Sequence, residues 1–397
     1  MQQTTHPIAA ALLATAVILA TAPMAQAEPY MAVRGGFSCG DCHVNRSGGG
    51  MRTLTAEMHA VDILSLPNEG MGILPAHEDW FSPNVSDFFS IGADVRLVDK
   101  VTFKDNPVYA DGNDTVGSVK NNTAFRSLDS NDMDLAQATI YAHLRLIPEV
   151  LSVYIDEDLS PGGGNSAENR EAFILLDKVL PNDAYIKAGR FFPAWGLKLQ
   201  DDESFAGSVA GFTFNRTVAG LELGRSGEGL NWFVSVSEST EDDDTDQLLV
   251  ASAYRMWPEV GPFANLMAGA SAAHDKPNSN EALWLTAFGG ASIGRWTLLA
   301  QSTFVDSETS GETTKSWAAS GEANYLWRDW INTKVVFDYY DPDDDQTEDA
   351  RNRVSLGIEP FIDRFLQLRV FYRVFNGPEN QPQYNRDELT LEAHLFF

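Results

Sequence analysis

Apolar and polar side chains alternate with a period of two along the C-terminal part of the chain. In the terminal segment, one face carries Leu389, Leu391, Ala393, Leu395 and Phe397, and most residues between them are polar or charged. The same alternation runs through residues 366–374, 330–340 and 136–146. Each run has about ten to twelve residues, which is the length of a tilted strand that crosses a bilayer.

Short and long connections alternate between these segments. Very short connections lie at 147–149, 181–183, 294–295, 328–329 and 362–364. Longer polar connections lie at 104–132, 159–169, 192–208, 240–246, 274–280, 306–314, 341–350 and 376–385. We therefore predict an all-β fold, a transmembrane antiparallel β-barrel of about 16 strands over residues 86–397. A soluble sandwich or propeller also alternates, but it rarely combines this loop asymmetry with so many polar residues on the second face.

The first 27 residues have the pattern of a secretory signal peptide. The apolar run 8–22 is followed by Ala25-Gln26-Ala27, the small residues that a signal peptidase reads. A transmembrane helix is the alternative, but the run is shorter than the 18 or more residues that span a bilayer. We expect residues 1–27 to be removed and the barrel to lie in the outer membrane of a Gram-negative cell, with both ends of the barrel in the periplasm.

Charge excludes one class of partner. The chain has 28 Lys plus Arg against 56 Asp plus Glu, a formal net charge of −28, so a nucleic-acid partner is not expected. Acidic clusters fall in the predicted long loops at 201–203, 241–246 and 341–345. They would attract a cationic electron donor, or bind calcium and magnesium that bridge to lipopolysaccharide, and the two roles are compatible.

The two cysteines lie in one motif, Cys39-Gly40-Asp41-Cys42-His43. This spacing is that of a c-type haem attachment site, in which Cys39 and Cys42 form thioethers and His43 is the proximal ligand of the iron. A disulfide or a thiol redox pair is the alternative, but it leaves His43 unexplained. Zinc would need two further ligands that no second CxxC supplies. We predict one covalent haem c in a segment spanning residues 28–85, which is periplasmic or plugs the lumen.

The distal side of such a haem has several candidate ligands. His59, Met58 and Met51 lie within reach in the sequence, and each has the simpler interpretation of a packing or surface residue. The predicted strand order also brings two lumen-facing histidines, His143 and His394, to within about 10 Å of each other. The interpretation of these two as ordinary polar lumen residues is favoured.

The N-terminal residues, together with the barrel that follows them, resemble a known protein family. The stretch 30–34, the motif 39–43, Val44-Asn45 and Gly48-Gly49-Gly50-Met51-Arg52-Thr53, followed by a barrel, resemble the fused monohaem cytochrome–porins of the bacterial outer membrane, including the outer-membrane cytochromes of iron-oxidising bacteria. Residues 187–197 resemble a strand-and-loop segment of phosphate-selective-type porins. The resemblance implies a haem on Cys39, Cys42 and His43 and electron transfer across the outer membrane.

Two functions follow from this sequence. The first is an outer-membrane electron conduit that exchanges electrons between an extracellular metal ion such as Fe(II), or another redox partner, and a periplasmic c-type cytochrome. Such a protein is an electron-transfer protein and a candidate iron oxidase. The alternative is an anion-selective or general diffusion porin, with a minor or regulatory role for the haem. In that case the cations that select anions in the lumen would be Arg145, Lys187, Arg369 and Arg373.

Overall fold

The described part of the chain covers most of the predicted barrel and the predicted haem attachment motif, residues 39–43, called the haem motif below. The computed structural model describes residues 28–53, 55–56, 84–110, 114–119, 126–159, 167–199, 204–212, 216–239, 247–275, 280–309, 311–363 and 365–397. The predicted signal peptide lies outside these residues, as do Met58, His59 and the acidic clusters at 201–203 and 241–246.

Sixteen antiparallel strands close into a barrel, as the alternation predicted. Each strand pairs with the next along the chain, and the last pairs with the first, with Leu389 opposite Val101. Closure satisfies every strand edge, which is the condition for a sheet to span a bilayer. The strands are β2 (Phe89–Lys104), β5 (Ser127–Ile147), β6 (Leu151–Asp158), β7 (Glu168–Leu176), β8 (Tyr185–Phe191), β9 (Val218–Arg225), β10 (Leu230–Glu238), β11 (Gln247–Val260), β12 (Phe263–Asp275), β13 (Asn280–Ile293), β14 (Trp296–Thr309), β15 (Glu312–Arg328), β16 (Ile331–Asp341), β17 (Arg351–Asp363), β18 (Leu366–Asn376) and β19 (Arg386–Phe396).

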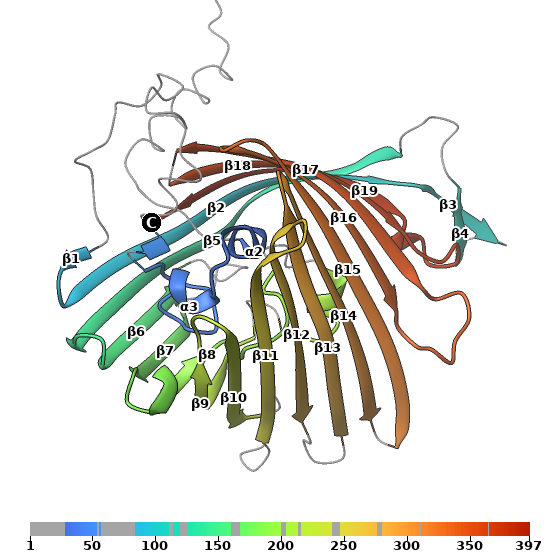
Figure 1. Cartoon of the computed structure of the whole chain (residues 1–397). Coiled ribbons are helices and arrows are strands. Elements are labelled where there is room, and N and C mark those ends of the chain that lie inside the picture. The colour runs from blue at the N-terminus through green and yellow to red at the C-terminus, as the bar shows by residue number, and fades with distance from the viewer. Residues whose placement is uncertain are drawn as a thin grey trace, which may run out of the picture.

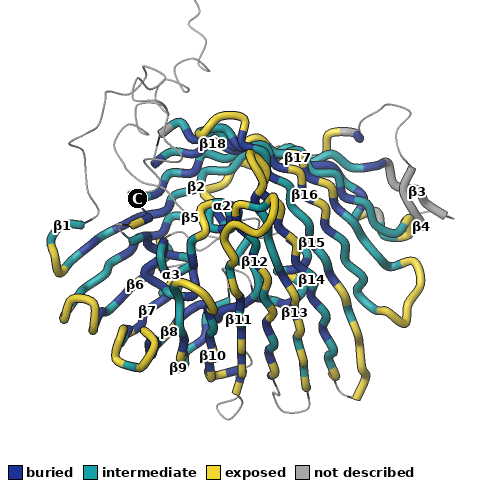
Figure 2. Tube along the Cα trace, viewed as in Figure 1, coloured by how far each residue is buried: buried dark blue, intermediate teal, exposed yellow. Residues whose placement is uncertain are grey.

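Burial alternates along these strands (Figure 2). Many of the exposed side chains are large and apolar. In β16 the side chains of Val335 and Phe337 are exposed, whereas Lys334, Val336 and Asp338 are buried on the lumen side. The exposed tryptophans Trp257, Trp296 and Trp327 lie close to the short turns. An apolar outer surface with aromatic residues near a rim is typical of a barrel that sits in lipid.

Some predicted loops are strand instead. Within the predicted loop 104–132, β3 (Asn106–Ala110) pairs with β4 (Asp114–Val119), and β5 already begins at Ser127. The predicted loop 306–314 is reduced to a tight turn, because β14 and β15 remain paired out to Thr309 and Glu312. Polar residues were read as loop here, but strands that extend beyond the bilayer need no apolar face. A small strand, β1 (Asn84–Ser86), pairs with the start of β2.

Two segments from distant parts of the chain fold into the barrel (Figure 1). The N-terminal segment, defined here as residues 28–53, contains α2 (Pro29–Gly35) and α3 (Cys39–Cys42). The second is the connection between β8 and β9, whose described residues 192–199, 204–212 and 216–217 are called the inward loop below. Its helix α5 (Phe205–Ser208) packs on β14, β15 and β16. Two 3₁₀ turns, Pro181–Asp183 and Pro382–Tyr384, lie in connections between strands. None of the helices among the described residues is long and apolar enough to cross a membrane.

Placing a charge on the lipid-facing side of a strand should destabilise the barrel. Leu356 lies near the middle of β17 and is 54% exposed on the outer surface. We expect Leu356→Arg to lower the free energy of unfolding in lipid by about 2–4 kcal/mol, because a guanidinium near the bilayer midplane loses its hydration. The measurement is equilibrium urea unfolding in vesicles. Asp345→Arg, in the exposed loop between β16 and β17, is the matched control, and an equal loss in both variants would contradict the lipid-facing assignment.

Candidate functional site

The N-terminal segment occupies the barrel lumen near the end formed by the short turns. Arg34 donates a hydrogen bond to the carbonyl of Gly294, in the turn between β13 and β14. The Arg46 guanidinium pairs with Asp177, which follows β7. The Gly40 amide donates to Ser226, which follows β9. Because each of these partners adjoins a short turn, the haem motif is held at that end of the barrel.

Glu28 anchors the start of this segment. Its carboxylate accepts hydrogen bonds from Lys334 Nζ at 2.7 Å, Arg369 Nη2 at 2.8 Å and Gln367 Nε2 at 3.1 Å. Burial opposes ionisation of Glu28, but the Lys334 ammonium and the Arg369 guanidinium hold its pKa down to about 2. A carboxylate that is buried, ionised and bonded to two cations fixes the position of the chain that carries it.

A second set of lumen contacts holds the region after the haem motif. Lys187 lies fully buried, 2.7 Å from Glu222, and its Nζ also donates to Asn45 Oδ1 at 2.9 Å and Ser47 Oγ at 3.1 Å. The side-chain amide of Asn45 (Nδ2) in turn donates a hydrogen bond to Glu171 Oε1 at 2.7 Å. Lys187 therefore binds the N-terminal segment.

The cations expected to select anions all have partners within the protein. Arg369 holds Glu28, and Lys187 holds the segment as described above. Arg145 donates to Ser90 and to two backbone carbonyls, while Arg373 donates to Thr390. Two of the four cations are thus committed to holding the segment in place.

The local sequence folds the haem motif onto a short helix and a glycine turn. Ser38 and Asp41 cap the first turn of α3 reciprocally, and the His43 amide donates to the Cys39 carbonyl. A bridge between His43 and Arg52 then closes the turn that contains Gly48, Gly49 and Gly50, all with positive φ. At Gly50 a Cβ would lie 2.4 Å from Tyr154 Oη, so this turn requires glycine.

His43 is presented in the form that binds a metal. Its Nδ1 lies 3.3 Å from the Gly50 carbonyl, and because a carbonyl only accepts, this nitrogen carries the proton. The Nε2 lone pair is then available to a ligand. Burial lowers the pKa of His43 to about 4, so the imidazole is neutral at physiological pH.

Both cysteines are free thiols that resist ionisation. Burial, together with Cys39 and Asp41 nearby, raises the pKa of Cys42 to about 12. Burial also raises the pKa of Cys39, whose sulfur accepts a hydrogen bond from Tyr254 Oη at 3.4 Å. Catalytic redox cysteines need an accessible thiolate, so these environments do not favour a thiol redox pair.

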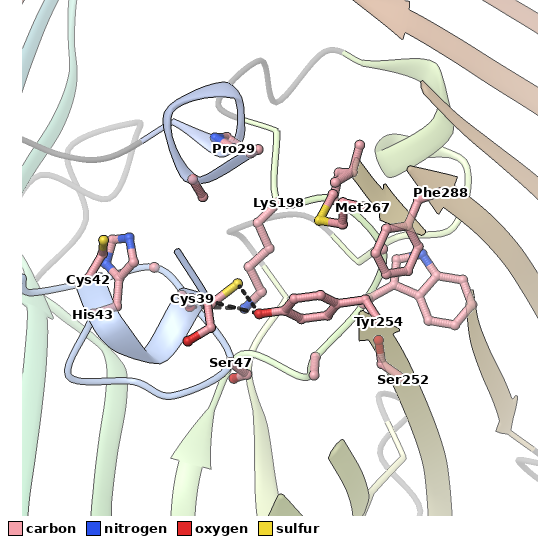
Figure 3. Close-up of a pocket in the computed structure, with 18 of the residues that line it drawn as sticks. Pro29, Cys39, Cys42, His43, Ser47, Lys198, Ser252, Tyr254, Met267 and Phe288 are labelled. Atoms are coloured by element: carbon pink, nitrogen blue, oxygen red, sulfur yellow. Dashed lines mark hydrogen bonds between the residues drawn. The ribbon is translucent and has the colours of Figure 1, made fainter. Parts of the chain in front are cut away.

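The motif borders a cavity of about 90 Å³ between the N-terminal segment, the inward loop and the barrel wall (Figure 3). Cys39, Cys42 and His43 line one side of it. The rest is largely apolar and aromatic, with contributions from Phe37, Trp195, Leu197, Phe233, Tyr254, Met256, Met267 and Phe288. The donor set and the apolar lining fit a covalently attached haem.

The inward loop supplies the part of the cavity that sequence reasoning missed. Trp195 and Lys198 both line it, and Lys198 Nζ donates to the Gly48 carbonyl at 3.3 Å, across 150 positions of sequence. Burial lowers the pKa of Lys198 to about 8. Trp195 also stacks on Phe212, with ring centroids 4.5 Å apart. The resemblance of residues 187–197 to a porin strand-and-loop segment marked this region without indicating that it reaches the haem motif.

The distal ligand remains a prediction. Met51 is buried against the wall, where its amide donates to Tyr154 Oη and its side chain lies beside Gly92. It is not among the residues that line the cavity. Met58 and His59 lie outside the described residues.

The two lumen histidines are further apart than the expected 10 Å. His143 lies opposite Ser90 and His394 opposite Arg96, an offset of six residues along β2, or roughly 20 Å along the strand. His394 bonds to Asp94 at 3.0 Å, and His143 lies beside Arg145. Both are polar residues of the lumen wall.

Comparison with known proteins identifies the barrel type. No protein-family model matches the chain, and no curated protein matches it in sequence. Among solved structures, in-vitro folded OmpT, an outer-membrane protein of Vibrio cholerae, aligns with a TM-score of 0.56 at 10% identity, over 80% of this chain and 100% of that one. The chain has a porin fold.

Two further porins give the same result. The anion-selective porin from Comamonas acidovorans aligns with a TM-score of 0.55 at 9% identity, over 78% of this chain and 100% of that one. The outer-membrane channel DcaP of Acinetobacter baumannii aligns with a TM-score of 0.54 at 12% identity, over 78% and 98%. With its apolar outer surface, the protein is an outer-membrane β-barrel.

Neutralising Glu28 should release the N-terminal segment and leave the barrel folded. Glu28→Gln weakens its bonds to Lys334 and Arg369, each worth about 1.5–3 kcal/mol as a hydrogen bond to a charged group. We expect faster hydrogen exchange at amides of residues 29–52 and unchanged exchange in β16 and β18. Glu228→Gln, in an exposed turn at the same end, is the control, and equal protection in both variants would refute the anchor.

The same anchor should be sensitive to acid. Because the Glu28 pKa is lowered in the folded protein, its stabilising effect is present above the ordinary value of 4.5 and is lost as the pH falls toward 2. Exchange of the segment in the wild type should therefore rise toward that of Glu28→Gln over this pH interval, after correction for intrinsic exchange rates. A constant difference between the two proteins down to pH 2 would contradict the assignment.

Proposed function

We propose that this protein is an outer-membrane electron conduit in which one haem c is held inside a porin-type barrel. The observation that carries the proposal is the position of the CxxCH motif, which lines an apolar cavity within the lumen. Through this cavity the protein would exchange electrons between an extracellular donor or acceptor and a periplasmic c-type cytochrome. The proposal matches the resemblance to fused monohaem cytochrome–porins.

A covalent haem at this site would supply one-electron redox chemistry. The protein residues would attach this haem, orient its ligand and shield it from water. The thiols of Cys39 and Cys42 would attach it, and His43, oriented by the Gly50 carbonyl, would offer Nε2 to the iron. Trp195 and the aromatic residues of the wall would exclude water from the cavity.

The thickness of the membrane separates redox partners on its two sides, and the barrel provides a place for a redox centre between them. A hydrocarbon core about 30 Å thick separates soluble redox partners on its two sides. An eight-stranded barrel is filled by its own side chains, whereas a barrel of this size has a lumen wide enough to admit a peptide. A redox centre carried on that peptide would lie at the short-turn end of the lumen, within reach of a periplasmic partner.

Diffusion of solutes is the second candidate function, and the similarity of the barrel to porins favours it. A diffusion porin keeps a water-filled passage lined by side chains that face the solute. In this lumen the N-terminal segment and the inward loop both occupy space, and Lys187 and Arg369 bind the segment. These contacts support the conduit, whereas the similarity of the barrel to known porins supports the second candidate.

The long-loop end is the proposed cell-surface side, and it carries acidic residues. Asp343, Asp344 and Asp345 follow β16, and their carboxylates lie within 4.8 Å of one another. Such a loop would raise the local concentration of a cationic donor such as Fe(II), or bind the cations that bridge to lipopolysaccharide. The opposite end, with the exposed turn at Gly35 and Gly36, would face a periplasmic cytochrome.

Covalent haem should depend on the two thiols. We expect the double variant Cys39→Ala/Cys42→Ala to abolish covalent haem staining of the purified, denatured protein, because neither of the two thioethers that define the site can form. Ser252→Ala, which alters another residue lining the same cavity, should keep the stain. Haem staining that persists in a protein lacking both Cys39 and Cys42 would refute the attachment site.

Purified protein in liposomes separates the two functions. We expect external Fe(II) to reduce an acceptor enclosed in liposomes that contain the wild type, and not in liposomes with Cys39→Ala/Cys42→Ala. Swelling of the same liposomes in small solutes measures diffusion. Rapid swelling without any reduction of the enclosed acceptor would reject the conduit and support the porin.

A further inference from the structure

One cation reaches the cavity from the side opposite to the haem motif. Among the described residues that line the cavity, Lys198 is the single lysine or arginine. It belongs to the inward loop, which leaves the barrel wall at the end of β8 and turns into the lumen. Figure 3 shows its side chain running down beside Cys39, where its Nζ bonds to Gly48. The loop thereby places a charged group directly against the haem motif.

Backbone contacts with the wall fix the position of this part of the loop. The Gly196 amide donates to Ser271 Oγ at 3.1 Å, and the Leu197 amide donates to Gln301 Oε1 at 2.7 Å. Gly196 has φ of +46°, and a Cβ there would lie 2.5 Å from Gln301 Oε1. A side chain at this position would therefore be strained. Lys198, two residues further on, extends from a backbone with little freedom to move.

The charges around Lys198 are balanced as a group. Two cations, Lys187 and Lys198, lie near two buried carboxylates, Glu171 and Glu222. Glu222 pairs with Lys187 at 2.7 Å, and Glu171 accepts from Asn45 and from the Phe192 amide. Removing the Lys198 ammonium makes the net charge of this group more negative by one unit beside the haem motif.

Charge near a haem acts on its reduction potential. The oxidised iron carries one more positive charge than the reduced iron, so a nearby cation disfavours the oxidised form. The effect is large where water is scarce, because the effective dielectric constant is low. A cation at this position would raise the reduction potential, and an uncompensated carboxylate would lower it.

We propose that Lys198 is the residue through which the inward loop sets the reduction potential of the haem, biasing the site toward accepting an electron. The inference rests on the proposed haem site and deepens it. Lys198 acts on the haem electrostatically and is a tuning residue, with no bond to the iron required. The loop on the proposed cell-surface side thus contributes to the redox properties of a motif held at the other end of the barrel.

The test is a spectroelectrochemical redox titration of the full-length haem-loaded protein. We expect the midpoint potential to shift downward in Lys198→Met and in Lys198→Gln, and to stay near the wild-type value in Lys198→Arg, which keeps the charge. Lys178→Met is the matched control, because Lys178 pairs with Glu149 at an exposed turn, away from the cavity. Its potential should equal that of the wild type.

Two outcomes of the redox titration would overturn the inference. An unchanged potential in Lys198→Met and Lys198→Gln overturns the inference. Equal shifts in the Met, Gln and Arg variants also overturn it, because they trace the effect to loop packing instead of charge. The pyridine haemochrome spectrum of the wild type is measured first. If it shows no haem c, the proposed function fails and the inference with it, whereas haem c with an insensitive potential refutes the inference alone.

Discussion

Burial of the Glu28 carboxylate between Lys334 and Arg369 is the interaction on which the placement of the haem motif depends. A charged group is stable in a lumen wall only when its partners compensate for lost hydration. Here the two cations lie on β16 and β18, and the carboxylate lies on the chain just before α2. Because α3 follows α2 after three residues, fixing Glu28 also restricts where Cys39 and His43 can lie.

The lipid bilayer determines the form of the barrel that surrounds the N-terminal segment. Lipid requires every backbone group of the barrel to be paired, so the strands close and their side chains alternate between lipid and lumen. Alternation places polar residues such as Asn332, Asp338 and Arg353 on the inner face. In an open pore such residues face water. Here many bond to one another or to the two inserted segments, as Asp338 does to the inward loop through Ser204. The requirement for closure thus creates the surface on which the inserted segments dock.

The parts that could be predicted from sequence are those with a local cause. Strand number followed from side-chain alternation. The haem site was inferred from five consecutive residues and stays a prediction. The error at 306–314 also had a local origin, because polar composition was read as loop where paired strands extend beyond the bilayer. Lys198 could not be predicted, since its position depends on contacts of Gly196 and Leu197 with β12 and β14, distant in sequence. Neither composition nor spacing marks a loop that turns inward.

A solute channel and an electron conduit make opposite demands on a lumen. A channel needs continuous water, whereas a redox centre gains from a dry, rigid environment. The cavity beside Cys39 is lined largely by apolar and aromatic residues, and its walls come from both inserted segments and from β10 to β13. Trp195 continues outward to Phe212, which meets Trp284 edge to face at 5.8 Å. Such packing fills part of the lumen beside the motif, and a dry, rigid surrounding of this kind is what the proposed haem site needs.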